Sequence, residues 1–147
     1  MVLLLTAILL ISDTPRAGVQ DAILGVRVGS TAQEVSSVLR TRGSVESRPT
    51  REGGSKQVWR LDGTDFSSIA LKLDAAGRVV WVTAFARPGR EIPFKQLGDT
   101  SRARSASPSR VVWDVSTAAG GYRLVAQGKD GRAGTVSLLG FDKEAVE

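Results

Sequence analysis

The feature that most constrains the fold is a strict alternation of side chains in residues 66–74 that runs directly into a turn. Ile69, Leu71 and Leu73 are separated by small or polar residues, as expected for a strand with one buried face. The sequence DAAGR at residues 74–78 suits a three-residue hairpin loop, in which glycine supplies the positive φ angle. This region therefore predicts two antiparallel strands joined by a tight turn.

The turn sets the register of the second strand, and the register decides which of its side chains face the core. If Leu73 lies opposite Val79, then Leu71 lies opposite Trp81, and Trp81 points into the core. The outer face of the strand then carries Val80, Val82 and Ala84. Small apolar side chains on an outer face mark either a partner surface or the footprint of another element. We therefore expect these three residues to contact a partner, unless a neighbouring segment covers them.

Other alternating segments predict the rest of the sheet. Further strands are expected at residues 58–61, 111–115, 122–127 and 132–141. Polar loops are expected at residues 44–57 and 97–110. A second hairpin turn with a Gly-Arg exit, at residues 128–132, resembles the first one. The two hairpins hint at a degenerate internal repeat.

One helix is predicted in the segment 23–43. Thr31 and Glu34 form a Thr-x-x-Glu capping box, in which both side chains satisfy free amide groups of the first turn. Val35, Val38 and Leu39 follow at helical spacing, and Gly43 is expected to end the helix in a left-handed conformation. The fold class predicted for residues 23–147 is therefore a single α+β domain, with one main helix packed on an antiparallel β-sheet of about five to six strands.

Residues 1–22 are expected to form a signal peptide or another N-terminal segment. The apolar run 2–11 would span only about 15 Å as a helix, half of a bilayer core, so no stable membrane span is expected. A short apolar run followed by polar residues is typical of a secretory signal. A buried first strand or helix is the alternative. The predicted location is periplasmic or secreted.

The composition argues against most catalytic and metal sites. The chain contains no cysteine and no histidine, which removes thiol nucleophiles, histidine bases and the usual zinc or copper ligands. Nucleophile-elbow, Ser-x-x-Lys and phosphate-loop motifs do not occur either. We therefore expect no enzymatic activity, no metal and no cofactor. The net charge of +5 favours acidic partners, although an arginine-rich genome would produce the same balance.

The motif I-x-G-x-x-x-G-x-T-x-x-E-V at residues 23–35, followed by strands and a glycine turn, resembles the SmpA/OmlA (BamE-like) outer-membrane assembly modules. It is also similar to the related β-lactamase-inhibitor-protein fold. The resemblance covers about residues 23–86 and implies a helical segment packed on an antiparallel sheet. The chain has no acceptor cysteine, so a lipid anchor is not implied, and no partner-binding residue is carried over.

The function favoured by the sequence is a non-catalytic, exported protein-interaction module of the bacterial cell envelope. Its partner is expected to be another protein or an envelope component. The predicted contact residues are Val80, Val82, Ala84, Lys72, Arg48 and Arg51. The alternative is a basic binder of nucleic acid or anionic polymer that stacks bases on its three tryptophans. Nucleic acid is less favoured because strand parity turns the tryptophans inward. An unusual enzyme using Asp, Arg or Ser is the third hypothesis.

Overall fold

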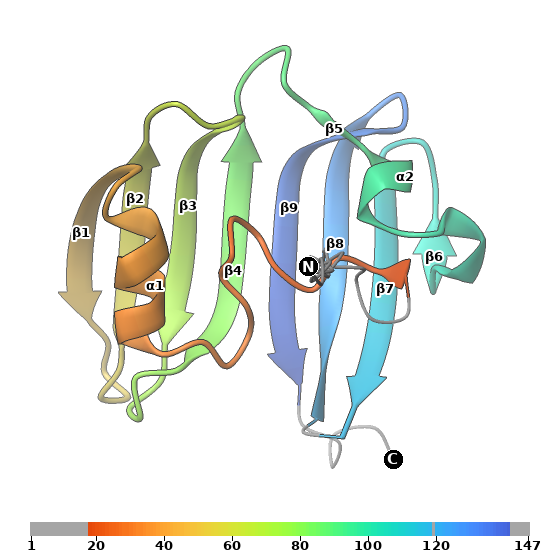
Figure 1. The fold of residues 1–147 in the computed structure, drawn as a ribbon. Helices are drawn as coiled ribbons and strands as arrows, with labels where there is room; N and C mark the ends of the chain where they lie inside the picture. The colour runs from red at the N-terminus through yellow and green to blue at the C-terminus, as the bar shows by residue number, and fades with distance from the viewer. Residues whose placement is uncertain (1–17, 119, 142–147) are drawn as a thin grey trace, which may run out of the picture.

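The computed structural model describes residues 18–118 and 120–141, which form one antiparallel sheet of nine strands (Figure 1). The strands are β1 (Gly43–Pro49), β2 (Ser55–Leu61), β3 (Phe66–Leu73), β4 (Val79–Ala86), β5 (Ile92–Pro93), β6 (Ser105–Ala106), β7 (Arg110–Thr117), β8 (Gly120–Lys129) and β9 (Arg132–Phe141). The helices are α1 (Ala32–Leu39), α2 (Phe94–Leu97) and the 3-10 turn η2 (Thr100–Arg102). The predicted α+β fold, a main helix on five to six strands, is wrong because the described chain is mostly β and α1 has only eight residues.

The sheet consists of two meanders joined at their last strands. The strand order is β1-β2-β3-β4-β9-β8-β7-β6, and β5 pairs with β9 beyond the end of β4. β4 and β9 therefore lie at the centre, and each meander runs outward from there (Figure 1). A helix precedes each meander, α1 the first and α2 the second. Each half thus contains a helix followed by four strands, and the second half also has β5 before α2 and η2 after it.

The helix begins where the sequence predicts and ends earlier. The Thr31 hydroxyl accepts a hydrogen bond from the Glu34 amide at 3.2 Å, and the Glu34 carboxylate accepts one from the Thr31 amide at 3.2 Å. The capping box is therefore confirmed. α1 stops at Leu39, and Gly43 belongs to β1 instead of closing the helix. A Cβ atom on Gly43 would lie 1.8 Å from the Arg60 carbonyl oxygen, so close strand pairing explains this glycine.

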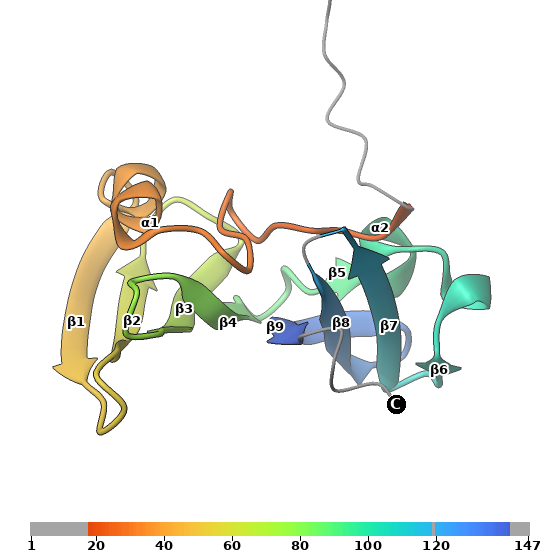
Figure 2. The same cartoon turned by 90° about the horizontal axis from the view of Figure 1, so that it is seen from below.

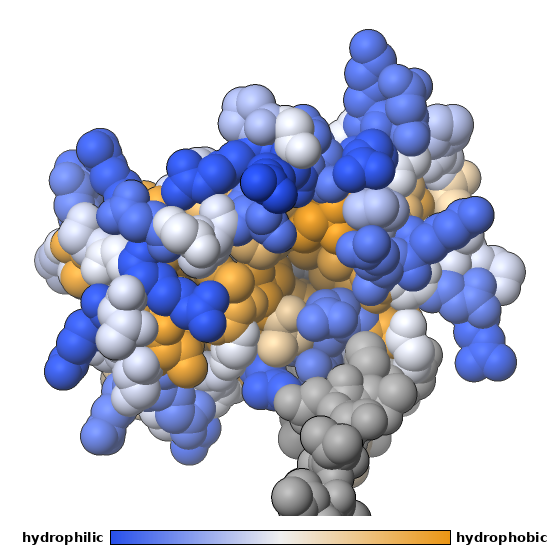
Figure 3. Space-filling model, turned by 45° about the horizontal axis from the view of Figure 1, so that its top comes forward, coloured by the Kyte–Doolittle hydropathy of each residue, from blue (hydrophilic) through white to orange (hydrophobic). Residues whose placement is uncertain are grey.

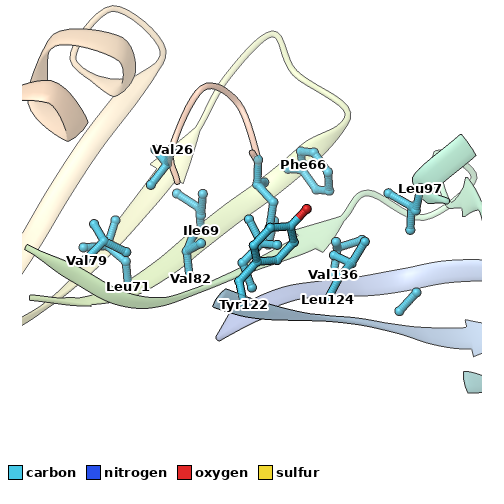
Figure 4. Close-up of a cluster of buried hydrophobic side chains, with 14 of the residues drawn as sticks. Val26, Phe66, Ile69, Leu71, Val79, Val82, Leu97, Tyr122, Leu124 and Val136 are labelled. Carbon is cyan, nitrogen blue, oxygen red and sulfur yellow. The ribbon is translucent and has the colours of Figure 1, made fainter. Parts of the chain in front are cut away.

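The core lies on one side of the sheet. Figure 2 shows α1 and the N-terminal segment on this covered face, with no helix on the other side of β2, β3, β4 and β9. Val35 and Leu39 of α1 are fully buried, as is Val26 of the N-terminal segment. Figure 4 shows Val26 above side chains of the sheet, among them Ile69 and Val82. The apolar faces of both meanders thus form one continuous core.

The predicted register of β3 and β4 fails after the first pair. Leu73 does pair with Val79, but Lys72 pairs with Trp81, so Val80 is an extra residue in β4. Val79 also exchanges backbone hydrogen bonds with the N-terminal segment, from its amide to the Ser30 carbonyl oxygen and from the Gly29 amide to its own carbonyl oxygen, each at 2.8 Å. This extra residue is a bulge, and it inverts the direction of every later side chain in β4.

The second hairpin is displaced by two residues from its predicted register. Asp130 and Gly131 both have positive φ angles and form a two-residue turn, and Gly134 is an extra residue in β9 that forms a bulge after the turn. Leu124 therefore pairs with Leu138 instead of Val136. Because a two-residue shift preserves parity, all three side chains remain in the core, as predicted.

Two of the predicted loops contain strands. Residues 44–57 form β1 and the start of β2, joined by a turn in which the Thr50 amide donates to the Gly54 carbonyl oxygen at 2.9 Å. Residues 97–110 contain η2 and β6. The expected loop at residues 44–57 is therefore wrong, whereas residues 97–110 are a loop interrupted by these two short elements.

Most of the predicted signal segment, residues 1–17, lies outside the described residues. The chain is described from Gly18, and Val19 forms a bridge with Gly98 beside α2. The carbonyl oxygen of Val19 accepts a hydrogen bond from the Tyr122 hydroxyl at 3.2 Å. In the described part of the chain, no helix is long and apolar enough to cross a membrane.

Candidate interaction surface

The face of the sheet opposite α1, here called the open face, presents three rows of side chains. Paired residues on neighbouring strands point to the same side, so the strand register defines each row. The first row is Ser44, Arg60, Ser68, Phe85, Thr135, Gln127 and Arg110. The second row is Glu46, Val58, Ala70, Thr83, Ser137, Val125 and Val112. The third row is Arg48, Lys56, Lys72, Trp81, Leu139, Arg123 and Asp114.

The open face carries large apolar side chains around a polar centre, where the hydroxyl groups of Thr83 and Ser137 lie 2.8 Å apart. We call Val58, Trp81, Phe85 and Leu139 the apolar strip. Val58 is 45% exposed, Phe85 42% and Leu139 39%, whereas Trp81 is half-buried. Three of these residues belong to the central strands β4 and β9. Soluble proteins rarely expose several large apolar side chains on one face. The strip is therefore the strongest sign of a contact surface.

The β1–β3 end of the open face is basic. Arg48, Lys56 and Lys72 lie directly opposite one another on three adjacent strands. The Lys72 ammonium pairs with the Glu52 carboxylate at 2.7 Å, whereas the Lys56 ammonium lies 6.0 Å from the ring centroid of Trp81, at the outer limit of a cation–π contact. The hydrogen bond from Lys72, reinforced by its charge, lowers the pKa of Glu52.

A shallow depression, here called the basic recess, lies beside these residues. Its volume is about 430 Å³, and it is lined by Arg48, Pro49, Thr50, Arg51, Glu52, Lys56 and Lys72. The structure therefore brings together three of the predicted contact residues, Arg48, Arg51 and Lys72. Arg51 reaches the recess from the turn between β1 and β2, and the other two from the strands.

The positive charge at the β7–β8 end of the open face is partly neutralised. Asp114 accepts hydrogen bonds from Arg123 at 2.6 and 3.0 Å and from Arg104 at 2.8 Å. The hydrogen bond from Arg123 is the largest cause of the lowered pKa of Asp114. The hydrogen bond from Arg104 also lowers this pKa. Because Asp114 binds both arginines, this end offers less free positive charge than the basic recess.

The predicted apolar contact residues do not lie on this surface. Val82 and Ala84 are fully buried on the covered face, where Val82 pairs with Leu71. Val80 is half-buried at the bulge of β4. The expectation that these residues contact a partner is therefore wrong for Val82 and Ala84, because the bulge reverses the strand. Trp59 and Trp113 are buried as predicted, whereas Trp81 lies on the open face.

Lys56 and the whole apolar strip were not predicted as contact residues from the sequence. The strip residues of β4 occur in the run VVWVTAFA, whose apolar side chains on both parities give no clear choice of face. One signal was present in β3, because Lys72 must avoid the core and Trp81 is its partner across the hairpin. If the residue opposite Lys72 had been required to face solvent as Lys72 does, Trp81 would have been placed on the open face.

A second depression lies on the covered side, between the N-terminal segment and α2. It has a volume of about 240 Å³ and is lined by Gln20, Ala22, Ile23, Leu24, Phe66, Ile92, Gln96, Leu97 and Val136. Figure 3 shows apolar atoms at the surface in the middle of this side of the molecule. Most of the lining residues also belong to the main core or pack against it. The depression is therefore small and continuous with the core.

Residue types for metal binding do not gather in the described parts of the chain. No group of three Asp, Glu, His or Cys side chains there is arranged to hold a metal ion. Among residues 18–118 and 120–141, Ser30 is the one buried polar side chain, and its hydroxyl accepts a hydrogen bond from the Arg27 amide at 3.0 Å. The described site can bind a partner through apolar contact and charge.

Comparison with family models, characterised proteins and solved structures found no significant match to this chain. The resemblance to BamE-like modules stays a prediction, and function has to be argued from the open face itself.

Proposed function

We propose that the protein is a non-catalytic, exported protein-interaction module that binds another protein or an envelope component through its open face. The observation that carries the proposal is the exposed apolar strip on a sheet face that no helix covers among the described residues. Soluble domains normally bury such a face against another layer. A partner protein would supply the missing layer.

The open face is large enough for a specific complex. Seven neighbouring strands contribute to its rows, in the spatial order β1-β2-β3-β4-β9-β8-β7. With about 4.8 Å between adjacent strands, the face is about 29 Å wide. Along each strand, the first and third rows are four residues apart. The face is therefore about 20 Å long in the strand direction when the side chains at both edges are included. The resulting area of about 600 Å² approaches the 800 Å² that each partner contributes to a standard interface.

Export to the periplasm or out of the cell is part of the proposal and is supported by the apolar run at residues 2–11. N-terminal sequencing of the protein recovered from its host tests this part. A mature N-terminus between residues 12 and 18 would support export, whereas recovery of the chain from its first residue would contradict it.

Affinity capture from a host envelope extract tests the open face. The wild-type chain is compared with Phe85→Ser and Leu139→Ser, which remove exposed apolar side chains from the strip. Val45→Ser is the matched control because Val45 is 44% exposed but points to the covered side. Partners that survive both strip substitutions, or that the control also loses, would contradict the proposal. Circular dichroism of each variant checks that the fold is retained.

A basic binder of anionic polymer is the second candidate, and the row of Arg48, Lys56, Lys72 and Trp81 favours it. Such binding would weaken steeply with salt, because each neutralised phosphate releases counterions. A protein complex would lose less affinity in high salt than a polyanion complex, because its contacts to the apolar strip are not screened. Measuring the captured complex at two salt concentrations therefore separates the two candidates.

A further inference from the structure

We propose that the partner of the open face is an acidic protein surface. Its carboxylates would bind Arg48, Lys56 and Lys72 at the basic recess, while its apolar side chains would pack on Trp81 and Leu139. This inference rests on the proposed function and adds the chemistry of the partner. It also assigns a separate role to each end of the open face.

The arrangement of like charges is the first argument. Lys56 lies directly opposite both Arg48 and Lys72, and like charges at directly opposite positions destabilise a sheet. Among the described residues, only Lys72 of these three has a carboxylate within ion-pair distance, namely that of Glu52. The stability of the free protein therefore does not explain this row, whereas binding to carboxylates does.

The apolar strip is the second argument, because it distinguishes a protein from a polyanion. Lys56 and Trp81 lie in the same row, and Leu139 is the neighbour of Trp81 on β9. Phe85 and Val58 extend the apolar area into the other two rows. A phosphate or sulfate polymer has few apolar groups to bury there, whereas a protein surface combines carboxylates with apolar side chains.

Charge also argues against a second copy of this chain as the occupant. The chain has a net charge of +5, and its open face is basic at the recess. The carboxylate at the opposite end, Asp114, already binds Arg104 and Arg123. Two copies placed face to face would therefore bring positive charge against positive charge, or against a cluster whose two arginines outnumber its one carboxylate.

Glu52 occupies the recess in the free protein. Its carboxylate pairs with Lys72, yet its own side chain is 77% exposed and lies in the turn between β1 and β2. A partner carboxylate would have to compete with Glu52 for Lys72. Removing the charge of Glu52 should therefore strengthen the binding of an acidic partner.

The test uses three soluble probes: a random copolymer of glutamate and tyrosine, polyglutamate, and heparin. The copolymer combines carboxylates with aromatic groups, polyglutamate has carboxylates alone, and heparin has sulfates alone. Binding to the whole protein is measured by the fluorescence change of Trp81. Trp59 and Trp113 are buried and serve as background. We expect the copolymer to bind more tightly than polyglutamate, and heparin to bind no more tightly than polyglutamate.

Two pairs of variants assign the binding to the recess. Lys56→Gln should weaken copolymer binding about two- to fivefold, and Glu52→Gln should strengthen it by a similar factor. Lys95→Gln and Asp62→Asn are the matched controls, since each changes the same charge at an exposed position away from the recess. The controls should change the affinity less than the recess variants do.

The inference is overturned if the copolymer does not bind, if heparin binds more tightly than the copolymer, or if the controls match the recess variants. Its failure can be distinguished from failure of the proposed function. If Leu139→Ser abolishes capture of the natural partner while Lys56→Gln and Glu52→Gln leave it unchanged, the open face is the binding site but its partner is not acidic.

Discussion

Replacing Val82 by threonine tests the direction of β4, on which the position of the open face depends. Val82 is 0% exposed, pairs with Leu71 and Leu138, and lies within the apolar core. Threonine has nearly the same shape but places a hydroxyl group where apolar side chains surround it. Burying that hydroxyl without a full hydrogen-bond partner should lower the free energy of unfolding by about 2 kcal/mol.

The assay is urea unfolding followed by circular dichroism. With a slope of about 2 kcal/mol per molar urea, the midpoint should fall by about 1 M. Val58→Thr is the matched control, because it is the same substitution on the open face, where Val58 is 45% exposed. It should change the free energy by less than about 0.5 kcal/mol. Equal losses at both positions, or a larger loss at Val58, would refute the assignment of the two faces.

Three further predictions follow from buried and paired groups. Burial, with a smaller effect from nearby negative charge, raises the pKa of Tyr122 to about 12. Because this is the chain's single tyrosine, the phenolate absorbance of the folded protein should rise near that pH. Stability should fall as the pH rises from about 10, where the unfolded tyrosine ionises, to about 12. A rise near pH 10, the ordinary value, would contradict this burial. Gly43→Ala should cost about 1–3 kcal/mol because its Cβ would meet the Arg60 carbonyl oxygen, whereas Gly134→Ala, with open space, should be nearly neutral in thermal unfolding. Asp114→Asn should lower stability at neutral pH. Because the pKa of Asp114 is lowered in the folded protein, the difference in stability from wild type should disappear only below about pH 3.9. A difference that is lost at higher pH would contradict the pairing of Asp114 with its arginines.

The two hairpins show how far local sequence determines a sheet. Both turns were correctly located, and in both the residues beyond the turn contain a bulge that no local rule indicated. In the first hairpin the displacement is one residue, so Val82 and Trp81 exchange faces. In the second it is two residues, so Leu124 and Val136 remain in the core. Parity therefore decides whether a register error changes the predicted surface.

The edge strand β1 escaped prediction for a different physical reason. Its residues GSVESRP are nearly all exposed and polar, so neither face shows the alternation that a half-buried strand would have. Pairing with β2 alone holds the strand in place. The arginines of this segment were nevertheless identified as contact residues, and the structure places Arg48 and Arg51 in one recess with Lys72. The charged residues could be recognised in the sequence, whereas the residues that lie beside them on neighbouring strands could not.

The most direct test of the central claim is oxidative footprinting of the three tryptophans, read by mass spectrometry, in the purified protein and in intact host envelopes. Trp59 and Trp113 are buried and should be protected in both samples. Trp81, on the open face, should be oxidised in the purified protein and protected in the envelope, where a partner covers the face. Equal oxidation of Trp81 in both samples, or its protection in the purified protein, would contradict the account.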